Sequence, residues 1–241
     1  GTPGGDPMLG VETPVASPEI NLTSGIVLLD YGDIWKYNEL NRNLGTGWRR
    51  TTYSDASWKS GPGLLGLENS ALPDPGINTE INKGSQLCYY FRKQFTYSGD
   101  PSEVTLTIDQ IVDDGAVYYL NGTEVGRSRM PGGAVRFTTS SSATVTNAAE
   151  EKGVVTIGPG TLKNGSNILA VEVHQTNTTS SDIVFGCRMS ASVPAAKGVV
   201  INEIHPIAGK DAYIEFYNPT DKVIDLRDYY LSDDPGYLNK R

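Results

Sequence analysis

The middle of the chain, between residues 113 and 127, has the sequence of a β-hairpin. Val117 and Tyr119 alternate with Tyr118 and Leu120 in a run of β-branched and aromatic residues that is typical of a strand. The pair Asn121-Gly122 follows, and these residue types readily adopt the two positive φ angles of a type I′ turn. Residues 123–127 then resume the strand pattern. The hairpin requires an antiparallel sheet around it.

The rest of the sequence extends this pattern and predicts an all-β fold. The 241 residues include 27 Gly, 14 Pro and 13 Tyr, and no window has a sustained helical period of apolar residues. Further strands are expected at 26–29, 87–97, 104–111, 135–138, 154–157, 168–174 and 183–189. Their number and spacing are typical of a β-sandwich.

The charge and hydropathy of the chain exclude two classes of partner. The formal net charge is -8 at pH 7, which repels both phosphate backbones and anionic lipid headgroups. We therefore expect no nucleic-acid partner. No apolar run reaches the roughly 18 residues of a membrane-spanning helix, so no membrane span is expected.

Composition divides the chain into four parts. Residues 1–25, rich in Pro, Gly and Thr, are expected to form a linker or extended arm. Residues 26–193 form the large domain, 194–198 a second linker, and 199–241 a smaller region with its own strand pattern. Within the large domain, residues 68–85 are expected to form a long loop, and loops of that length are often functional.

Several motifs of the large domain resemble those of a known family. They are the hairpin at 113–127, the strand NILAVEVHQ at 167–175, the Ser-Ser-Asp sequence at 180–182, and the order of aromatic, Asp-x-Ser-Trp and Gly-Pro at 53–63. Together they resemble the galactose-binding-like jelly rolls that are appended to secreted bacterial hydrolases and surface proteins. The resemblance covers about two thirds of the chain. It implies a jelly-roll β-sandwich that recognises a ligand and performs no chemistry.

Residues 199–241 resemble the opening of a lamin-tail domain, an immunoglobulin-like β-sandwich. The motifs are Asn-Glu-Ile at 202–204, Ile-Glu-Phe-Tyr-Asn-Pro at 214–219 and Leu-Ser-Asp-Asp at 231–234. The match covers about the first half of such a domain. Because a partial sandwich leaves strand edges and an apolar face uncovered, we expect either further sequence or a strand from a neighbouring subunit to complete it.

The sequence offers little for catalysis, and we expect no catalytic residues. The two histidines, His174 and His205, lie in different predicted domains, and neither accompanies a recognisable nucleophile elbow. Paired acids occur at Asp113-Asp114, but adjacent residues on a strand point to opposite faces and do not converge as glycosidase carboxylates must.

The metal that the sequence best accommodates is calcium. No Cys/His spacing suits zinc, and two isolated cysteines cannot form a tetrahedral thiolate site. Aspartate and asparagine are abundant, and resemblance to jelly-roll binding modules implies one structural calcium. The acids expected to hold it are Asp113, Asp114 and Glu172.

A sugar site requires an aromatic ring for the apolar face of the sugar and polar groups for its hydroxyls. Trp35 and Tyr37 are the candidate stacking residues, and the alternative is that they pack over the sandwich end. The candidate polar residues lie at expected strand ends: Arg129, His174, Gln175 and Asp182. The alternative for these is a buried hydrogen-bond network that holds the loops together.

Two cysteines, Cys88 and Cys187, each lie in a strand pattern. A disulfide between them would close a loop of about 100 residues and stabilise the fold by roughly 4 to 5 kcal/mol in the chain-entropy model. The alternative is two buried thiols.

These observations favour a non-catalytic carbohydrate-binding or adhesion module of a secreted or cell-surface bacterial protein, with a polysaccharide or glycan as its partner. One alternative is a structural subunit of an extracellular assembly, in contact with neighbouring subunits. Another is an accessory region of a larger secreted hydrolase, in contact with further domains of the same chain.

Overall fold

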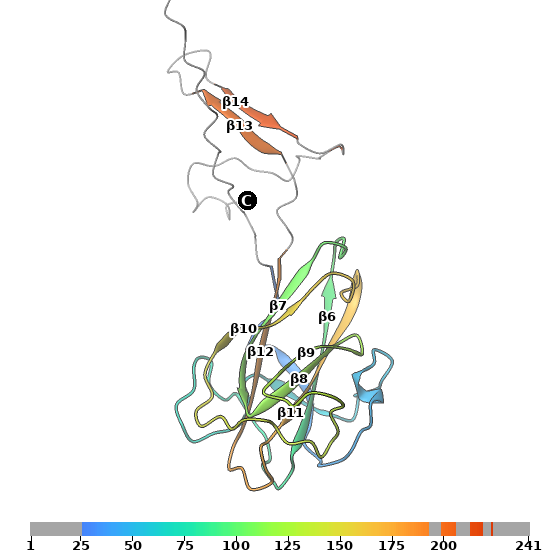
Figure 1. Cartoon of the computed structure of the whole chain (residues 1–241), viewed down its shortest axis with the longest axis vertical. Helices are drawn as coiled ribbons and strands as arrows, with labels where there is room; N and C mark the ends of the chain where they lie inside the picture. Colours follow the sequence, from blue (N-terminus) through green and yellow to red (C-terminus); the bar gives the residue numbers. More distant parts are fainter. Residues whose placement is uncertain (1–25, 193–198, 206–212, 219–222, 224–241) are drawn as a thin grey trace, which may run out of the picture.

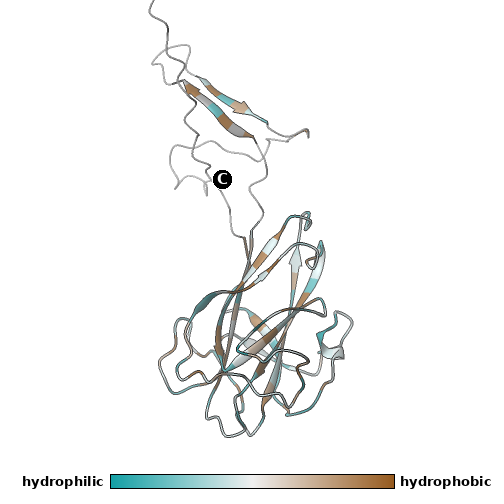
Figure 2. Cartoon of the chain, in the orientation of Figure 1, coloured by the Kyte–Doolittle hydropathy of each residue, from teal (hydrophilic) through white to brown (hydrophobic). Residues whose placement is uncertain are grey.

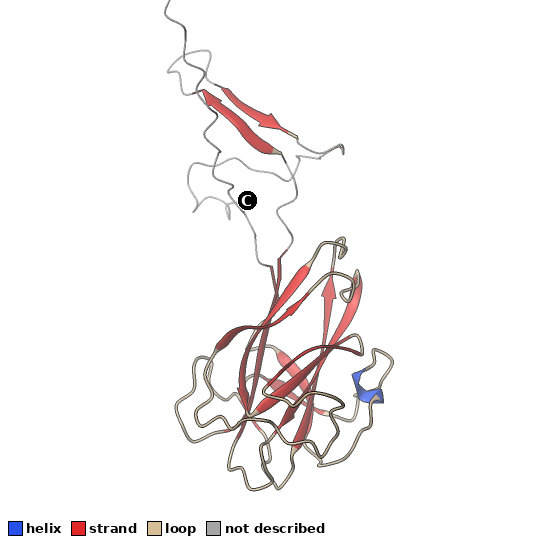
Figure 3. Ribbon diagram, viewed as in Figure 1, coloured by secondary structure: helices blue, strands red, loops and turns tan. Residues whose placement is uncertain are grey.

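A computed structural model shows that the chain is built from β-strands, which confirms the predicted all-β class (Figures 1 and 3). It describes residues 26–192, 199–205, 213–218 and 223. The predicted arm 1–25 and linker 194–198 lie outside the described residues. Among the residues described, no helix is long and apolar enough to cross a membrane.

Two sheets form a sandwich over residues 26–192. Sheet A has the strand order β10-β7-β12-β4-β5, and β1 also pairs with β12. Its strands are β1 (Ile26–Leu29), β4 (Leu65–Leu67), β5 (Thr79–Glu80), β7 (Thr105–Asp113), β10 (Glu151–Ile157) and β12 (Ile183–Ser192). Sheet B has the order β3-β2-β6-β11-β8-β9. Its strands are β2 (Ile34–Asn38), β3 (Lys59–Pro62), β6 (Cys88–Tyr97), β8 (Gly115–Leu120), β9 (Thr123–Ser128) and β11 (Gly165–His174). A single turn of 3-10 helix, η1 (Gly47–Arg49), precedes β3.

The predicted hairpin is confirmed as β8 and β9. Asn121 and Gly122 connect the two strands with φ angles of 53° and 93°, the positive values that a type I′ turn requires. The short strand expected at 135–138 is absent, because that segment forms a turn in which the Thr139 amide donates to the Arg136 carbonyl at 2.8 Å. Strands β2 to β5 lie outside the strand ranges expected from the sequence, and β5 falls in the loop expected at 68–85.

The main core lies between the sheets and is rich in aromatic residues (Figure 2 colours the strands by hydropathy). Phe91 of sheet B stacks on Phe185 of sheet A with ring centroids 4.0 Å apart. Trp35 meets the same Phe185 edge-on at 4.9 Å. These contacts hold the two sheets face to face.

The outer faces of both sheets are also covered. On sheet B, Trp48 packs against Tyr90 and Tyr119 at 4.7 and 5.8 Å. Arg92 on the same face is 2% exposed, and its guanidinium donates to the Asp55 carboxylate at 2.8 Å and to the carbonyl oxygens of Trp48 and Arg50. Loops therefore fold back over strand faces that point away from the core.

The predicted Cys88–Cys187 disulfide is wrong. Both cysteines are free and buried. Cys187 of β12 faces the core between the sheets, whereas Cys88 of β6 packs with Tyr90 on the outer face of sheet B. Sheet B separates the two sulfur atoms, and the alternative of two buried thiols is what the structure contains.

Two further strands, β13 (Val200–His205) and β14 (Tyr213–Tyr217), form an antiparallel sheet of their own. They match the first two strands expected for the immunoglobulin-like region. The strands expected beyond them lie in residues that the structure does not describe, apart from Val223. On this hairpin the side chains of Ile201, Ile204 and Phe216 are exposed.

Candidate metal centre and adjoining pocket

Three carboxylates meet on the outer face of sheet A where three of its strands begin or end. Leu67, the last residue of β4, pairs with Ile183, the first residue of β12, and both side chains face the core. The alternation of a strand therefore turns the next residues, Glu68 and Asp182, to the opposite face. Asp113 ends β7 and pairs with Val184, which also faces outward.

One carboxylate oxygen each of Glu68, Asp113 and Asp182 lies within 4.8 Å of the other two. Asp113 is fully buried, and neither of its carboxylate oxygens has a hydrogen-bond partner among the described residues. Glu68 Oε2 is likewise buried and unpartnered within that part of the chain, although its Oε1 accepts from the Ser70 amide at 2.7 Å. The cluster thus contains three buried carboxylate oxygens that accept no hydrogen bond from the described residues.

The electrostatics of the cluster favour a bound cation. Burial, together with the neighbouring charges of Asp114 and Asp182, raises the pKa of Asp113 to about 8. A buried carboxylate without donors is costly, and a second and third carboxylate beside it add repulsion. A divalent cation removes both penalties. Carboxylate oxygens are the ligands that calcium prefers, so the donor set fits this ion.

The structure does not bring together the three acids predicted to bind calcium. Asp113 belongs to the cluster. Asp114 is engaged elsewhere: its Oδ1 accepts from the Val145 amide at 2.7 Å, and its Oδ2 accepts from the amide and hydroxyl of Thr176 at 2.8 and 2.9 Å. Glu172 lies on sheet B, where it accepts a hydrogen bond from the Tyr119 hydroxyl. Asp114 therefore holds two loops together.

The aromatic residues predicted to stack on a sugar lie in the core. Trp35 is 1% exposed and Tyr37 is 6% exposed, and both belong to the cluster between the sheets. Neither ring is free to contact a sugar.

The polar residues predicted to bind a sugar are mostly occupied within the fold. His174 and Gln175 are fully buried. Arg129 donates to both carboxylate oxygens of Glu151, at 2.6 and 2.7 Å, and to the carbonyl oxygens of Asp114 and Val112. These three residues correspond to the buried network that was the alternative expectation, whereas Asp182 belongs to the acidic cluster.

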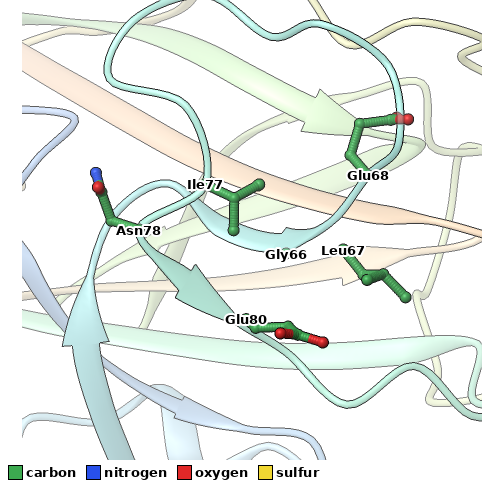
Figure 4. A pocket seen from close by; sticks show the side chains of 6 residues that line it. All are labelled: Gly66, Leu67, Glu68, Ile77, Asn78 and Glu80. Carbon is green, nitrogen blue, oxygen red and sulfur yellow. The ribbon is translucent and has the colours of Figure 1, made fainter.

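A pocket of about 360 Å³ adjoins the cluster at the edge of sheet A formed by β4 and β5 (Figure 4). It is lined by Gly66, Leu67, Glu68, Ile77, Asn78 and Glu80. Glu68 thus belongs both to the acidic cluster and to the pocket wall. Four of the lining residues, Glu68, Ile77, Asn78 and Glu80, lie in the segment 68–85 that the sequence analysis singled out by its length.

Sequence reasoning missed Glu68 as a site residue. The signal available was its position at the start of the long loop, directly after a short apolar segment. What was not available was the pairing of β4 with β12, which places Glu68 beside Asp182.

No protein-family model and no curated protein matches the chain. Solved structures that resemble it include a β-glucuronidase from glycoside hydrolase family 2, with 16% identity and a TM-score of 0.43 over 81% of this chain and 22% of the enzyme. A calcium-binding mutant of Bacteroides uniformis β-glucuronidase 2 gives 15% identity and a TM-score of 0.41 over 73% of this chain and 20% of that one.

The β-glucuronidase of Ruminococcus gnavus gives 10% identity and a TM-score of 0.43 over 79% of this chain and 33% of the enzyme. The chain therefore spans about a fifth to a third of the length of these structures.

Proposed function

We propose that the chain is a non-catalytic module that binds one calcium ion and a carbohydrate, as an accessory region of a larger secreted or cell-surface protein such as a hydrolase. The observation that carries the proposal is the buried Asp113 carboxylate, which has no donor and faces two further carboxylates. The carbohydrate follows from the sequence resemblance to galactose-binding-like jelly rolls. The lamin-tail resemblance of residues 199–241 suggests a second module in the same chain.

Calcium would stabilise the structure and would take no part in a reaction. Glu68, Asp113 and Asp182 would hold it, and they belong to the ends of three different strands of sheet A. A cation shared by the three would fix the start of the loop that follows Glu68. Because Ile77 and Asn78 at the far end of that loop line the pocket, the ion would also stabilise the pocket wall.

The pocket supplies the two kinds of contact that a sugar needs. Leu67 and Ile77 provide apolar surface for the C–H face of a ring. The carboxylate of Glu80 accepts hydrogen bonds from hydroxyl groups, and the Asn78 amide both donates and accepts. The Glu80 carboxylate in the wall favours a neutral sugar over a uronic acid, since like charges repel at short range.

Binding by so few contacts should be weak for a single sugar, and a polymer that offers repeated contacts should be retained more strongly. The test is affinity electrophoresis of the full chain through gels that contain neutral or acidic polysaccharides. We expect calcium-dependent retention by a neutral polysaccharide. Glu80→Gln should weaken it about tenfold or more, because hydrogen bonds to a charged group contribute about 1.5 to 3 kcal/mol.

The matched control is Glu103→Gln. Glu103 is exposed and lies just before β7, a strand length away from Asp113. This variant removes the same charge and should leave retention unchanged. Equal retention of the wild-type chain and the Glu80→Gln variant in every gel would place the carbohydrate site elsewhere, and no retention of any glycan would contradict the binding function.

A further inference from the structure

A second cluster of potential metal ligands is buried on the outer face of sheet B, opposite the core. Cys88 of β6 pairs in register with His174 of β11, and Glu172 lies two residues before His174 on the same strand. Side chains two residues apart on a strand share one face, and paired residues on neighbouring strands lie side by side. The strand register alone therefore brings the thiol, the imidazole and the carboxylate together.

The hydrogen bonding of His174 leaves one ring nitrogen facing this cluster. His174 Nδ1 lies 2.7 Å from the Thr139 carbonyl oxygen. A carbonyl oxygen can only accept, so Nδ1 carries the proton. In the neutral ring Nε2 then holds a lone pair, which faces Cys88 Sγ at 3.7 Å and Glu172 Oε2 at 3.6 Å.

The remaining carboxylate oxygen of Glu172 is held from the opposite side. Glu172 Oε1 accepts from the Tyr119 hydroxyl at 2.6 Å and from Arg49 Nη2 at 3.1 Å. Its Oε2 is left facing Cys88 Sγ at 4.0 Å. Metal-ligating histidines and carboxylates usually have such hydrogen bonds on their far sides, because these fix the ring tautomer and the direction of the lone pairs.

The three separations lie within a few tenths of an ångström of the edges of a tetrahedral metal site. Zinc lies about 2.3 Å from a cysteine sulfur and about 2.0 to 2.2 Å from histidine nitrogen and carboxylate oxygen, which places neighbouring ligand atoms roughly 3.3 to 3.6 Å apart. The observed distances are 3.6, 3.7 and 4.0 Å. Shifts of a few tenths of an ångström would close the site around the ion, and the contacts of Glu172 Oε1 with Arg49 and Tyr119 would not have to break.

We propose that Cys88, Glu172 and His174 form a buried zinc site. On binding, zinc takes the place of the thiol proton of Cys88 and of any proton on His174 Nε2, which leave to solvent, while the ionised Glu172 binds without proton loss. Arg49 is the cation that faces the site, and it stays paired with Glu172. The three ligands are each at most 2% exposed, so the ion would enter during folding and then hold β6 and β11 together.

The test uses the full chain, unfolded and then refolded with either zinc or EDTA, in buffer with excess calcium to occupy the acidic cluster of sheet A. After dialysis we expect about one zinc ion per chain refolded with zinc. Refolding with cobalt instead should give a thiolate-to-cobalt charge-transfer band in the near ultraviolet. Cys88→Ser should abolish the band and the bound zinc, whereas Cys187→Ser, which removes the other buried thiol, should retain both.

A second measurement does not depend on the folding of a variant. In mild denaturant, a thiol reagent should modify Cys88 at least about tenfold more slowly after refolding with zinc than with EDTA, because the zinc-bound thiolate is unavailable to the reagent and a ligand that binds the folded state suppresses opening. Cys187, which does not bind the ion, is the internal reference within the same chain and should be slowed less. Wild-type protein that retains no zinc and forms no cobalt band would overturn the proposal. So would metal that stays in Cys88→Ser but is lost from Asp113→Asn, since that ion would belong to the acidic cluster.

Discussion

Asparagine in place of Asp113 is expected to weaken calcium binding on the order of 100-fold or more, since the affinity of oxygen-ligand sites follows the number of carboxylates they contain. The same change should stabilise the metal-free fold at pH 8, because it removes a buried charge that has no donor. Thermal unfolding in EDTA and in excess calcium measures both effects.

The charge on Asp113 also makes the stability of the metal-free fold depend on pH, and the direction of this dependence follows from its pKa. The pKa of Asp113 is raised to about 8 in the folded chain, whereas an aspartate in an unfolded chain has a pKa of about 3.9. Between these values the metal-free folded state holds a proton that the unfolded state has released. The free energy of unfolding in EDTA should therefore fall as pH rises from about 4 to about 8.

Calcium should reverse this loss, and its stabilising effect should be larger at pH 8 than at pH 5, because the ion competes with the proton on Asp113. In EDTA at pH 8 the Asp113→Asn variant should melt at least about 3 °C above the wild-type chain. The control is Asp74→Asn, which changes an exposed aspartate in the same loop as Glu68. A wild-type Tm in EDTA that rises between pH 5 and pH 8 by more than the Tm of Asp113→Asn would contradict the expected charge state.

Trp35→Ala is expected to lower the free energy of unfolding by about 3 to 5 kcal/mol, the usual cost of truncating a large core aromatic residue. Trp35 is 1% exposed and packs edge-on against Phe185 of the opposite sheet. The loss should therefore appear in urea unfolding, followed by circular dichroism, in the absence of any carbohydrate.

Ile34→Ala provides the control on the same strand. Ile34 is 62% exposed, so its truncation should change stability by less than about 0.5 kcal/mol. If Trp35→Ala unfolded at the wild-type urea concentration but lost polysaccharide retention, Trp35 would be a binding residue at the surface and its position in the core would be refuted.

The strands that the sequence predicted are those with alternation and β-branched residues. The strand predicted at 104–111, with Leu106 and Ile108 on one face, corresponds to β7, and the aromatic alternation at 87–97 corresponds to β6. The strand β2 was missed because Trp35 and Tyr37 were weighed as surface aromatics, and their alternation with Lys36 is too short to stand out. The polar and turn-forming residues around Trp35 and Tyr37 favoured a loop more strongly than this short alternation favoured a strand.

The contacts between site residues could not be predicted, because they depend on which strands become neighbours in the sheets. Alternation shows that Cys88 and Tyr90 share a face, but it does not show whether that face is the core or the loop-covered exterior. The pairings of β4 with β12 and of β6 with β11 bring Glu68 to Asp182 and Cys88 to His174. These contacts join residues about 85 to 115 positions apart in the sequence, a range at which a single sequence carries no local signal.

Direct calcium titration of the EDTA-treated full chain, by isothermal calorimetry at pH 8, bears most directly on the function proposed for the Glu68, Asp113 and Asp182 cluster. We predict saturable binding at one site per chain in the wild-type protein, and loss of that site in both Asp113→Asn and Asp182→Asn. A wild-type chain that is folded in EDTA, gives no heat with calcium and shows no change in Tm on its addition would contradict the calcium site and the function built on it.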